Sequence, residues 1–211
     1  KGTGEKQLEI DRRLIKNRIA HLKKDLKSIE KERQTQRSLR KPFLKVALVG
    51  YTNAGKSTLM NNLTRSKFLV DDKLFATLDS SIRILNPPTT PKILITDTVG
   101  FIKKLPHSLI ASFKSTLEEI DEADLLLHVI DLNHPIYKEQ IETTNQVLKD
   151  LKLDNKPMFL IFNKIDLLQG SLFPKVLERS HQDSVAVSCL NPEDMIRLRD
   201  KIFSFFDQFM V

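Results

Sequence analysis

The sequence predicts an α/β fold in which a mostly parallel six-stranded sheet carries helices on both faces, preceded by a long amphipathic helix. After Pro42, apolar runs of strand length alternate with segments of helix length. Two of these runs, 125–130 and 158–162, are almost wholly apolar, as is typical of central parallel strands that are buried on both sides. From about residue 6 to residue 40 the chain contains neither proline nor glycine, which favours one continuous helix.

The elements after Pro42 can be assigned in order. Strands are expected at 44–49, 81–86, 92–96, 125–131, 158–162 and 184–188. Helices are expected from Ser57 onward and at 108–122, 135–151, 172–179 and 192–209. A proline-rich turn at 86–91 joins the second and third strands, which predicts a hairpin at one edge of the sheet.

The helix expected over residues 6–40 carries one narrow apolar stripe. Its members recur mostly in steps of four and three, which predicts a coiled-coil seam: Leu8, Ile15, Ile19, Leu22, Leu26 and Ile29. Such a seam needs a partner helix, and we expect that helix upstream of this sequence, which begins with lysine rather than methionine. Pro42 ends the helix, so we expect a helical segment at 1–41 and a separate α/β domain at 42–211.

Charge is unevenly distributed along the chain. Residues 1–41 hold 14 Lys and Arg against 6 Asp and Glu, a net charge of +8, whereas the whole chain of 211 residues has +7. All the excess positive charge therefore lies in the first segment, which predicts an arm for a polyanion, with RNA as the expected one. The alternative, a solvated helix whose lysines only maintain solubility, stays open.

Composition excludes several classes of protein. No apolar run approaches the length of a membrane span, and the first residues lack the apolar centre of a signal peptide. The single cysteine, Cys189, excludes an internal disulfide and a cysteine-based zinc site, which fits a reducing compartment. We expect a monomer without a membrane partner, located in the cytoplasm or in an organelle matrix.

A glycine-rich segment, Gly50–Ser57, directly follows the first expected strand. Glycines let consecutive backbone N–H groups turn toward one point, and the helix that follows adds its positive N-terminal end. Lys56 supplies a charge, and Ser57 supplies a hydroxyl for Mg²⁺. The sequence therefore predicts a phosphate loop with these binding residues: Tyr51, Thr52, Asn53, Ala54, Gly55, Lys56, Ser57 and Thr58.

A second motif, Asn163-Lys164-Ile165-Asp166, follows the strand expected at 158–162. Its aspartate can accept hydrogen bonds from both N1–H and the 2-amino group of guanine, a donor pair that adenine lacks. Asn163 is expected to address the O6/N7 edge, and the stem of Lys164 to pack along the ring. Ser188 and Cys189, at the end of the last strand, are expected to offer backbone N–H to O6.

The segment Asp97-Thr98-Val99-Gly100 closes the strand expected at 92–96. Asp97 there can order the shell of Mg²⁺, and the N–H of Gly100 can approach a γ-phosphate. A threonine is also needed to close on the metal, and Thr77 is the residue we expect, with Ser80 and Ser81 as alternatives. The predicted catalytic residues are thus Lys56, Thr77, Asp97 and Gly100, and the metal ligands Ser57, Thr77 and Asp97.

These motifs resemble the translation-factor-related class of GTPases, and their flanks are similar to the HflX family of ribosome-associated GTPases. The flanks that carry this resemblance are residues 2–13, 75–79 and 97–102. The resemblance implies a Ras-like P-loop fold, hydrolysis of GTP to GDP, and association with the large ribosomal subunit in splitting, recycling or rescue. It also implies that 1–41 is the end of a helical domain and that a further part lies upstream. The alternative is a G domain that gates an RNA-modification or ribosome-assembly module.

Three single residues refine this expectation. Phe101 stands where many small GTPases keep a glutamine that orients water, so we expect it to pack in the core and turnover to need a partner. Asn53 permits K⁺ beside the phosphates, as in potassium-activated relatives, or only shapes the loop. His128, inside an apolar strand, is expected to be a satisfied core histidine.

Overall fold

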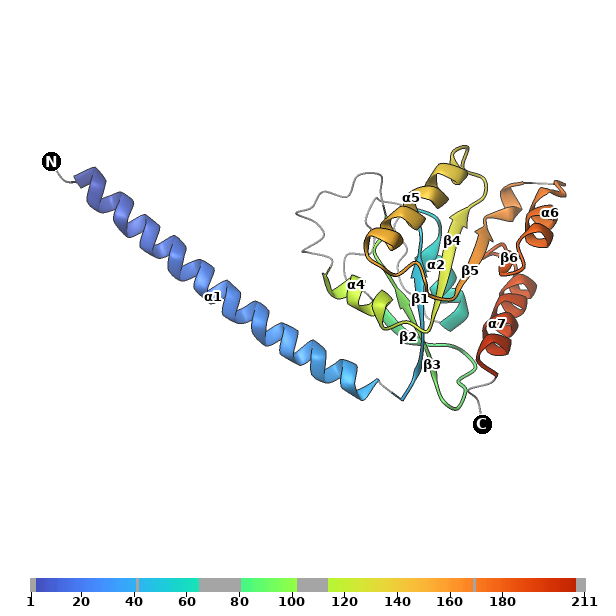
Figure 1. Cartoon of the computed structure of the whole chain (residues 1–211), viewed down its shortest axis with the longest axis horizontal. Coiled ribbons are helices and arrows are strands. Elements are labelled where there is room, and N and C mark those ends of the chain that lie inside the picture. The colour runs from blue at the N-terminus through green and yellow to red at the C-terminus, as the bar shows by residue number, and fades with distance from the viewer. Residues whose placement is uncertain (1–2, 41, 65–80, 102–113, 169, 208–211) are drawn as a thin grey trace. The chain divides into compact units, whose positions relative to one another are not determined.

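A computed structural model describes residues 3–40, 42–64, 81–101, 114–168 and 170–207 and divides the chain into two compact units, Lys1–Pro42 and Phe43–Val211 (Figure 1). The first unit is one helix, α1 (Thr3–Leu39). Its large apolar side chains are at least 46% exposed wherever they are described, as for Leu22 and Ile29. The described residues therefore leave the apolar seam of α1 uncovered.

The second unit contains a six-stranded sheet of order β2-β3-β1-β4-β5-β6. The strands are β1 (Leu44–Val49), β2 (Ser81–Ile84), β3 (Ile93–Asp97), β4 (Leu125–Asp131), β5 (Met158–Asn163) and β6 (Ser184–Ala186). All neighbouring pairs are parallel except the edge strand β2, which runs antiparallel to β3. The fold class and the edge hairpin expected from the sequence are confirmed.

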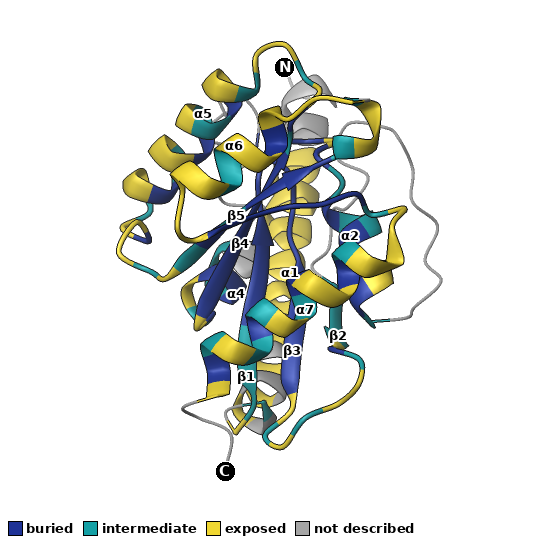
Figure 2. Cartoon of the chain, turned by 90° about the vertical axis from the view of Figure 1, so that its right-hand side faces the viewer, coloured by how far each residue is buried: buried dark blue, intermediate teal, exposed yellow. Residues whose placement is uncertain are grey.

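Helices cover both faces of the sheet, which explains why its central strands are mostly apolar (Figure 2). On one face, α2 (Lys56–Thr64) and α7 (Pro192–Phe206) pack against β1 and β3. On the other face, α4 (Lys114–Asp121) and α5 (Tyr137–Asp150) pack against alternate residues of β1 and β4. A smaller cluster joins α5 and α6 (Phe173–Ser180) to β5 and β6.

The predicted boundaries differ from the structure at a few places. The last strand ends at Ala186 rather than at residue 188, because the N–H of Ser188 donates to Asp194 Oδ2 (2.9 Å) instead of continuing the ladder. A 3₁₀ turn, η1 (Ile165–Leu167), was not predicted. The first part of the helix expected at 108–122 lies outside the described residues, and α7 ends at Phe206. No helix of the described part of the chain is long and apolar enough to cross a bilayer.

The parallel strands bring the predicted motifs to one edge of the sheet. The motifs follow the carboxyl ends of β1, β3, β5 and β6, and the strand order places β1 between β3 and β4. The connection after β1 leads to β2 and β3 on one side of it, and the connection after β3 leads to β4 on its other side. Open α/β sheets form a ligand crevice at such a reversal of strand order.

Candidate functional site

The phosphate loop, residues 50–57, connects β1 to the N-terminus of α2 and has a backbone that tolerates few side chains. Gly50 and Gly55 have positive φ angles of 140° and 96°. A Cβ atom at Gly50 would lie 2.3 Å from the Val129 carbonyl oxygen, and one at Gly55 would lie 2.3 Å from Asn163 Nδ2. Asn53 also lies in the left-handed region with φ 59°. Because successive N–H groups lead into a helix N-terminus, the loop has the geometry of an anion cradle.

Lys56 begins α2 and folds back over the phosphate loop. Its side chain is only 6% exposed, and Nζ donates to the carbonyl oxygens of Gly50 (3.2 Å) and Tyr51 (2.8 Å). Burial lowers the pKa of Lys56 to about 8, while the nearby charge of Asp97 acts in the opposite direction. Its ammonium group is thus held at the loop, where a phosphate would compensate its poor solvation.

Ser57 and Asp97 meet beside Lys56, as a metal site would require. The hydroxyl of Ser57 donates to Asp97 Oδ2 at 2.6 Å, and Asp97 is the last residue of β3. A hydroxyl and a carboxylate are hard oxygen donors, which suit Mg²⁺ together with phosphate and water. No group of three or more His, Cys, Asp or Glu residues that could hold a metal is found among the described residues. Thr77 and Ser80 lie outside them.

Gly100 and Phe101 return the chain from β3 to the phosphate loop. The N–H of Phe101 donates to the Gly50 carbonyl oxygen (3.0 Å), and the N–H of Thr52 donates to the Phe101 carbonyl oxygen (3.1 Å). A Cβ atom at Gly100 would lie 2.7 Å from Thr52 Cα, so this close approach requires glycine. The ring of Phe101 packs with Val49 and Ile120 and is 4% exposed. The expectation that Phe101 belongs to the core is confirmed.

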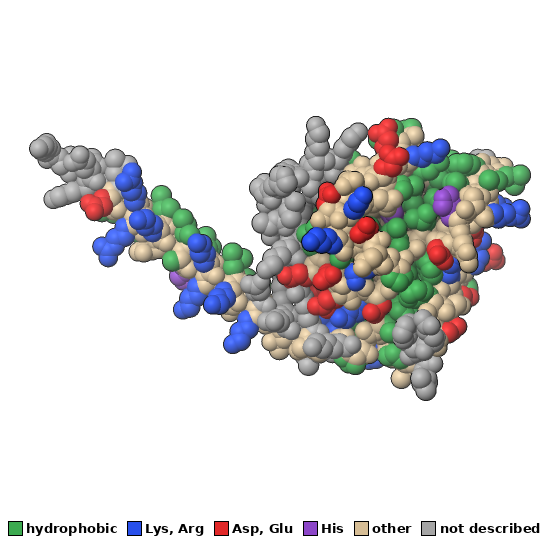
Figure 3. Space-filling model, in the orientation of Figure 1, with side chains coloured by type: hydrophobic (Ala, Val, Ile, Leu, Met, Phe, Trp, Pro, Cys, Tyr) green, Lys and Arg blue, Asp and Glu red, His purple; other side chains and the backbone are tan. Residues whose placement is uncertain are grey.

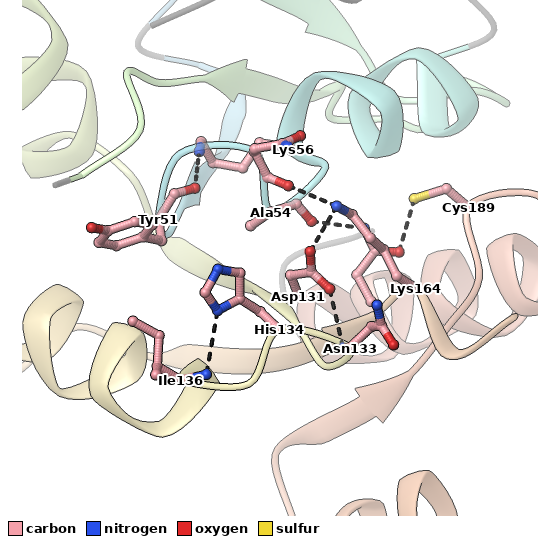
Figure 4. Close-up of polar contacts among 11 residues, drawn as sticks. Tyr51, Ala54, Lys56, Asp131, Asn133, His134, Ile136, Lys164 and Cys189 are labelled. Carbon is pink, nitrogen blue, oxygen red and sulfur yellow. Dashed lines mark hydrogen bonds and ion pairs between the residues drawn. The ribbon is translucent and has the colours of Figure 1, made fainter. Parts of the chain in front are cut away.

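The guanine loop, residues 163–166, is hydrogen-bonded to the phosphate loop (Figure 4). Asn163 Nδ2 donates to the Ala54 carbonyl oxygen (2.8 Å), and Lys164 Nζ donates to the Asn53 carbonyl oxygen (2.9 Å). Lys164 adopts a left-handed backbone with φ 64°, which the sequence did not reveal. Asp166 is exposed in η1. The structure therefore brings the two predicted loops together.

Ser188 and Cys189, which follow β6, were expected to offer backbone N–H groups to O6 of guanine, and the structure differs from this at Ser188. Ser188 cannot offer its N–H to a base as expected, because that N–H already donates to Asp194 Oδ2. The side chain of Cys189 also lies at the guanine loop, where Sγ donates to Asn163 Oδ1 at 3.2 Å. The expected role of the Cys189 N–H stays a prediction. Burial raises the pKa of the Cys189 thiol to about 12, and the bond to Asn163 opposes this only in part.

His128 is a core residue, but the expectation that it is satisfied is wrong for one of its nitrogens. The side chain is 1% exposed, and Nδ1 has no hydrogen-bond partner among the described residues. Burial, with a further contribution from the charge of Lys56, lowers the pKa of His128 to about 3. The imidazole is therefore neutral under ordinary conditions, and nothing in the apolar run around it indicated the missing partner.

Comparison with known proteins agrees with this geometry. Residues 45–164 match the family described as 50S ribosome-binding GTPase, and residues 1–40 match the GTP-binding GTPase Middle Region. GTPase HflX of Gluconacetobacter diazotrophicus is 50% identical over 210 residues, which cover 100% of this chain and 46% of that protein. The chain thus spans less than half the length of this relative.

Two solved structures extend the likeness to three dimensions. A GTP-binding protein from Sulfolobus solfataricus in complex with GDP has a TM-score of 0.64 at 28% identity, covering 92% of this chain and 58% of that one. Era in complex with MgGDPNP and a segment of 16S ribosomal RNA has a TM-score of 0.60 at 26% identity, covering 77% and 56%. With the resemblance to HflX confirmed by its relatives, the chain belongs to the 50S ribosome-binding GTPase family.

Proposed function

We propose that the chain binds GTP and hydrolyses it to GDP and phosphate with the help of Mg²⁺. The observation that carries this proposal is the bond from Asn163 Nδ2 to the Ala54 carbonyl oxygen at 2.8 Å. It joins the loop expected to select guanine to the loop expected to hold phosphates, so that one nucleotide spans both. Membership in a GTPase family supports the same conclusion.

The roles of the residues follow from phosphoryl-transfer chemistry, in which positioning and electrostatics supply most of the catalysis. Lys56 and the N–H groups of the phosphate loop hold the β- and γ-phosphates. Ser57 and Thr77 are the proposed ligands of Mg²⁺, with Asp97 ordering the shell. The bound ion would neutralise charge that develops on the phosphate oxygens. Gly100 donates its N–H to the γ-phosphate, and water attacks in line without a covalent intermediate.

Slow turnover in the free protein follows from Phe101. Its buried ring has no group that can orient water, so the attacking water must be ordered by something else. Asn53 is exposed at the phosphate loop, and we propose that its side-chain carbonyl helps to bind K⁺ there. A higher turnover in K⁺ than in Na⁺, lost on Asn53→Gly, would support that role.

We further propose that the large ribosomal subunit is the partner, with ribosomal RNA bound in part by α1. Four basic residues of α1, Arg12, Lys16, Lys23 and Lys27, recur in steps of four, seven and four, which place them on one side of the helix. Figure 3 shows hydrophobic side chains along one edge of α1 and Lys and Arg side chains along the opposite edge and on the face toward the viewer. Phosphates of RNA suit such a row of charges. Ribosome splitting, recycling or rescue in the cytoplasm is the proposed role.

The test is GTP turnover measured with and without purified large ribosomal subunits. We expect slow release of phosphate from the free chain and marked acceleration by subunits, in this chain or in a longer one that extends over the full length of the relatives. Lys56→Ala serves as the inactive control. Turnover that stays unchanged at saturating subunits in the longer chain would refute ribosomal control and favour a G domain that gates another module.

A further inference from the structure

An ion pair beside the guanine loop has no role in the mechanism proposed above. Lys164 Nζ lies 2.7 Å from Asp131 Oδ2, and the two residues are separated by 33 positions in the sequence. Their side chains are 26% and 14% exposed, so the pair is largely shielded from water. Such shielding makes the pair more sensitive to the loss of one partner than an exposed surface pair is.

Asp131 is held from both sides. It is the last residue of β4 and lies opposite Asn163 in the register with β5. Its Oδ1 accepts a hydrogen bond from the N–H of Asn133 at 3.1 Å, so the turn after β4 fixes the carboxylate. The other oxygen is thereby directed at Lys164.

Lys164 depends on such a partner because a lysine side chain has many rotamers. Fixing its long stem in one conformation costs conformational entropy. Its ammonium group donates to both Asp131 Oδ2 and the Asn53 carbonyl oxygen, at 2.7 and 2.9 Å, so it bridges the end of β4 and the phosphate loop (Figure 4). The carboxylate supplies the negative charge at this bridge, and a carbonyl oxygen alone does not.

We propose that Asp131 is a positioning residue for guanine-nucleotide binding, which holds Lys164 against the Asn53 carbonyl oxygen and so fastens the guanine loop to the phosphate loop. The inference rests on the proposed function of this site. Together with the bond from Asn163 to Ala54, the pair fastens the two loops at consecutive carbonyl groups. The stem of Lys164 is then already ordered when the base arrives, and the nucleotide does not have to order it.

The test replaces Asp131 by asparagine, which keeps an acceptor for the N–H of Asn133 and removes the charge. We expect GDP to bind about tenfold more weakly, with most of the loss in faster release. Asp131→Glu, which restores the charge, should recover part of the affinity. The matched control is Glu122→Gln, which breaks the ion pair between Lys45 Nζ and Glu122 Oε2, also 2.7 Å long, on other elements. GDP affinity should be unchanged in that control.

A double-mutant cycle separates positioning from a general loss of structure. In a Lys164→Ala background, Asp131→Asn should cause no further loss of GDP affinity, because the group that Asp131 positions is gone. Wild-type GDP affinity in Asp131→Asn, or two losses that multiply in the double variant, would overturn the inference. A wild-type chain that binds ADP as tightly as GDP would instead overturn the proposed function.

Discussion

The helix α1 and the sheet-containing unit use apolar side chains in opposite ways. In α1, Leu14 is 61% exposed and Leu26 is 65% exposed. In the sheet, Val46 and Leu127 are 0% exposed. Burial of a large apolar side chain stabilises a fold by about 1.5–3 kcal/mol. The second unit therefore supplies its own core, whereas the apolar residues of α1 contribute nothing comparable within the described residues.

The difference between the two units suggests that nucleotide binding and partner binding are carried by different parts of the chain. Every predicted site residue that the structure describes lies in the second unit, at the ends of its strands, on the loops that follow them or in the first turn of α2. Nucleotide binding should therefore depend on that unit alone. The exposed apolar side chains and the basic side chains of α1 instead suit binding to other molecules. We therefore expect α1 to determine how strongly the chain binds its partner.

The largest effect is expected from Lys56→Ala, which removes the ammonium group held at Gly50 and Tyr51. The variant has no charge-assisted hydrogen bond from this position to phosphate, so GTP affinity should fall at least a hundredfold, or about 3 kcal/mol. Isothermal titration with GTP measures this fall. The exposed lysine Lys92 provides the control, since Lys92→Ala should bind GTP normally. Folded Lys56→Ala protein with wild-type affinity would invalidate the assignment of the phosphate loop.

Removal of residues 1–42 tests the separation of the two units directly. GTP affinity should change by less than about twofold, because the core and the site remain intact. Binding to ribosomal RNA should weaken and become less dependent on salt. The slope of log K against log salt should decrease in magnitude by roughly 0.7–0.9 for each RNA phosphate that α1 neutralises in the intact chain.

A charge-conserving control completes this experiment. Exchanging lysine and arginine at positions 12, 13, 16, 23 and 24 in the intact chain should leave the salt slope unchanged. A large fall in GTP affinity after the truncation would show that α1 takes part in the nucleotide site, so that nucleotide binding does not depend on the second unit alone.

His128 should make the second unit sensitive to acid. Its pKa is lowered to about 3 in the folded state, mainly by burial, so between about pH 6.5 and 3 the unfolded chain binds a proton that the folded chain does not. The contribution of neutral His128 to the free energy of unfolding is therefore complete above pH 6.5, and it is lost as the pH falls from 6.5 to about 3. Urea unfolding at several pH values should show that the free energy of unfolding falls less steeply with decreasing pH in His128→Leu than in the wild type. His181→Gln, at an exposed histidine, should behave as the wild type.

The smallest effect is expected from Cys189, whose thiol donates to Asn163 Oδ1 at 3.2 Å. Cys189→Ala removes a weak hydrogen bond and should raise the dissociation constant of GDP about threefold. Cys189→Ser keeps a donor at this position and should restore most of the affinity. Equal affinities in all three proteins, measured by competition with labelled GDP, would mean that the thiol does not orient Asn163.

The sequence predicted the strands and the main loops because each has a local signature. Burial on both faces makes β4 and β5 mostly apolar, and the glycines at 50 and 55 mark a backbone that other residues rarely adopt. Interactions between distant segments have no such signature. Nothing in the sequence near Asp131 indicates that it pairs with Lys164, and the left-handed backbone of that lysine is set by the turn into η1.

The predictions for Ser188 and Thr77 at the site had different outcomes. Ser188 was expected to present its N–H to the base, and Asp194, an acidic residue in the first turn of α7, takes that bond instead. The carboxylate of Asp194 is close enough to accept the Ser188 N–H only because α7 folds back beside the end of β6. Sequence patterns do not show such a contact. The expected role of Thr77 stays a prediction, because it falls outside the described residues.

We propose that this chain selects guanine nucleotides through Asp166, and competition between GTP and ATP measures that selectivity. The wild type should bind GTP at least about a hundredfold more tightly than ATP. Asp166→Asn exchanges two acceptors for a donor and an acceptor, so it should lose GTP affinity by roughly 1–3 kcal/mol per unpaired group and gain affinity for xanthosine triphosphate. Equal affinity of the wild type for ATP and GTP would contradict this claim.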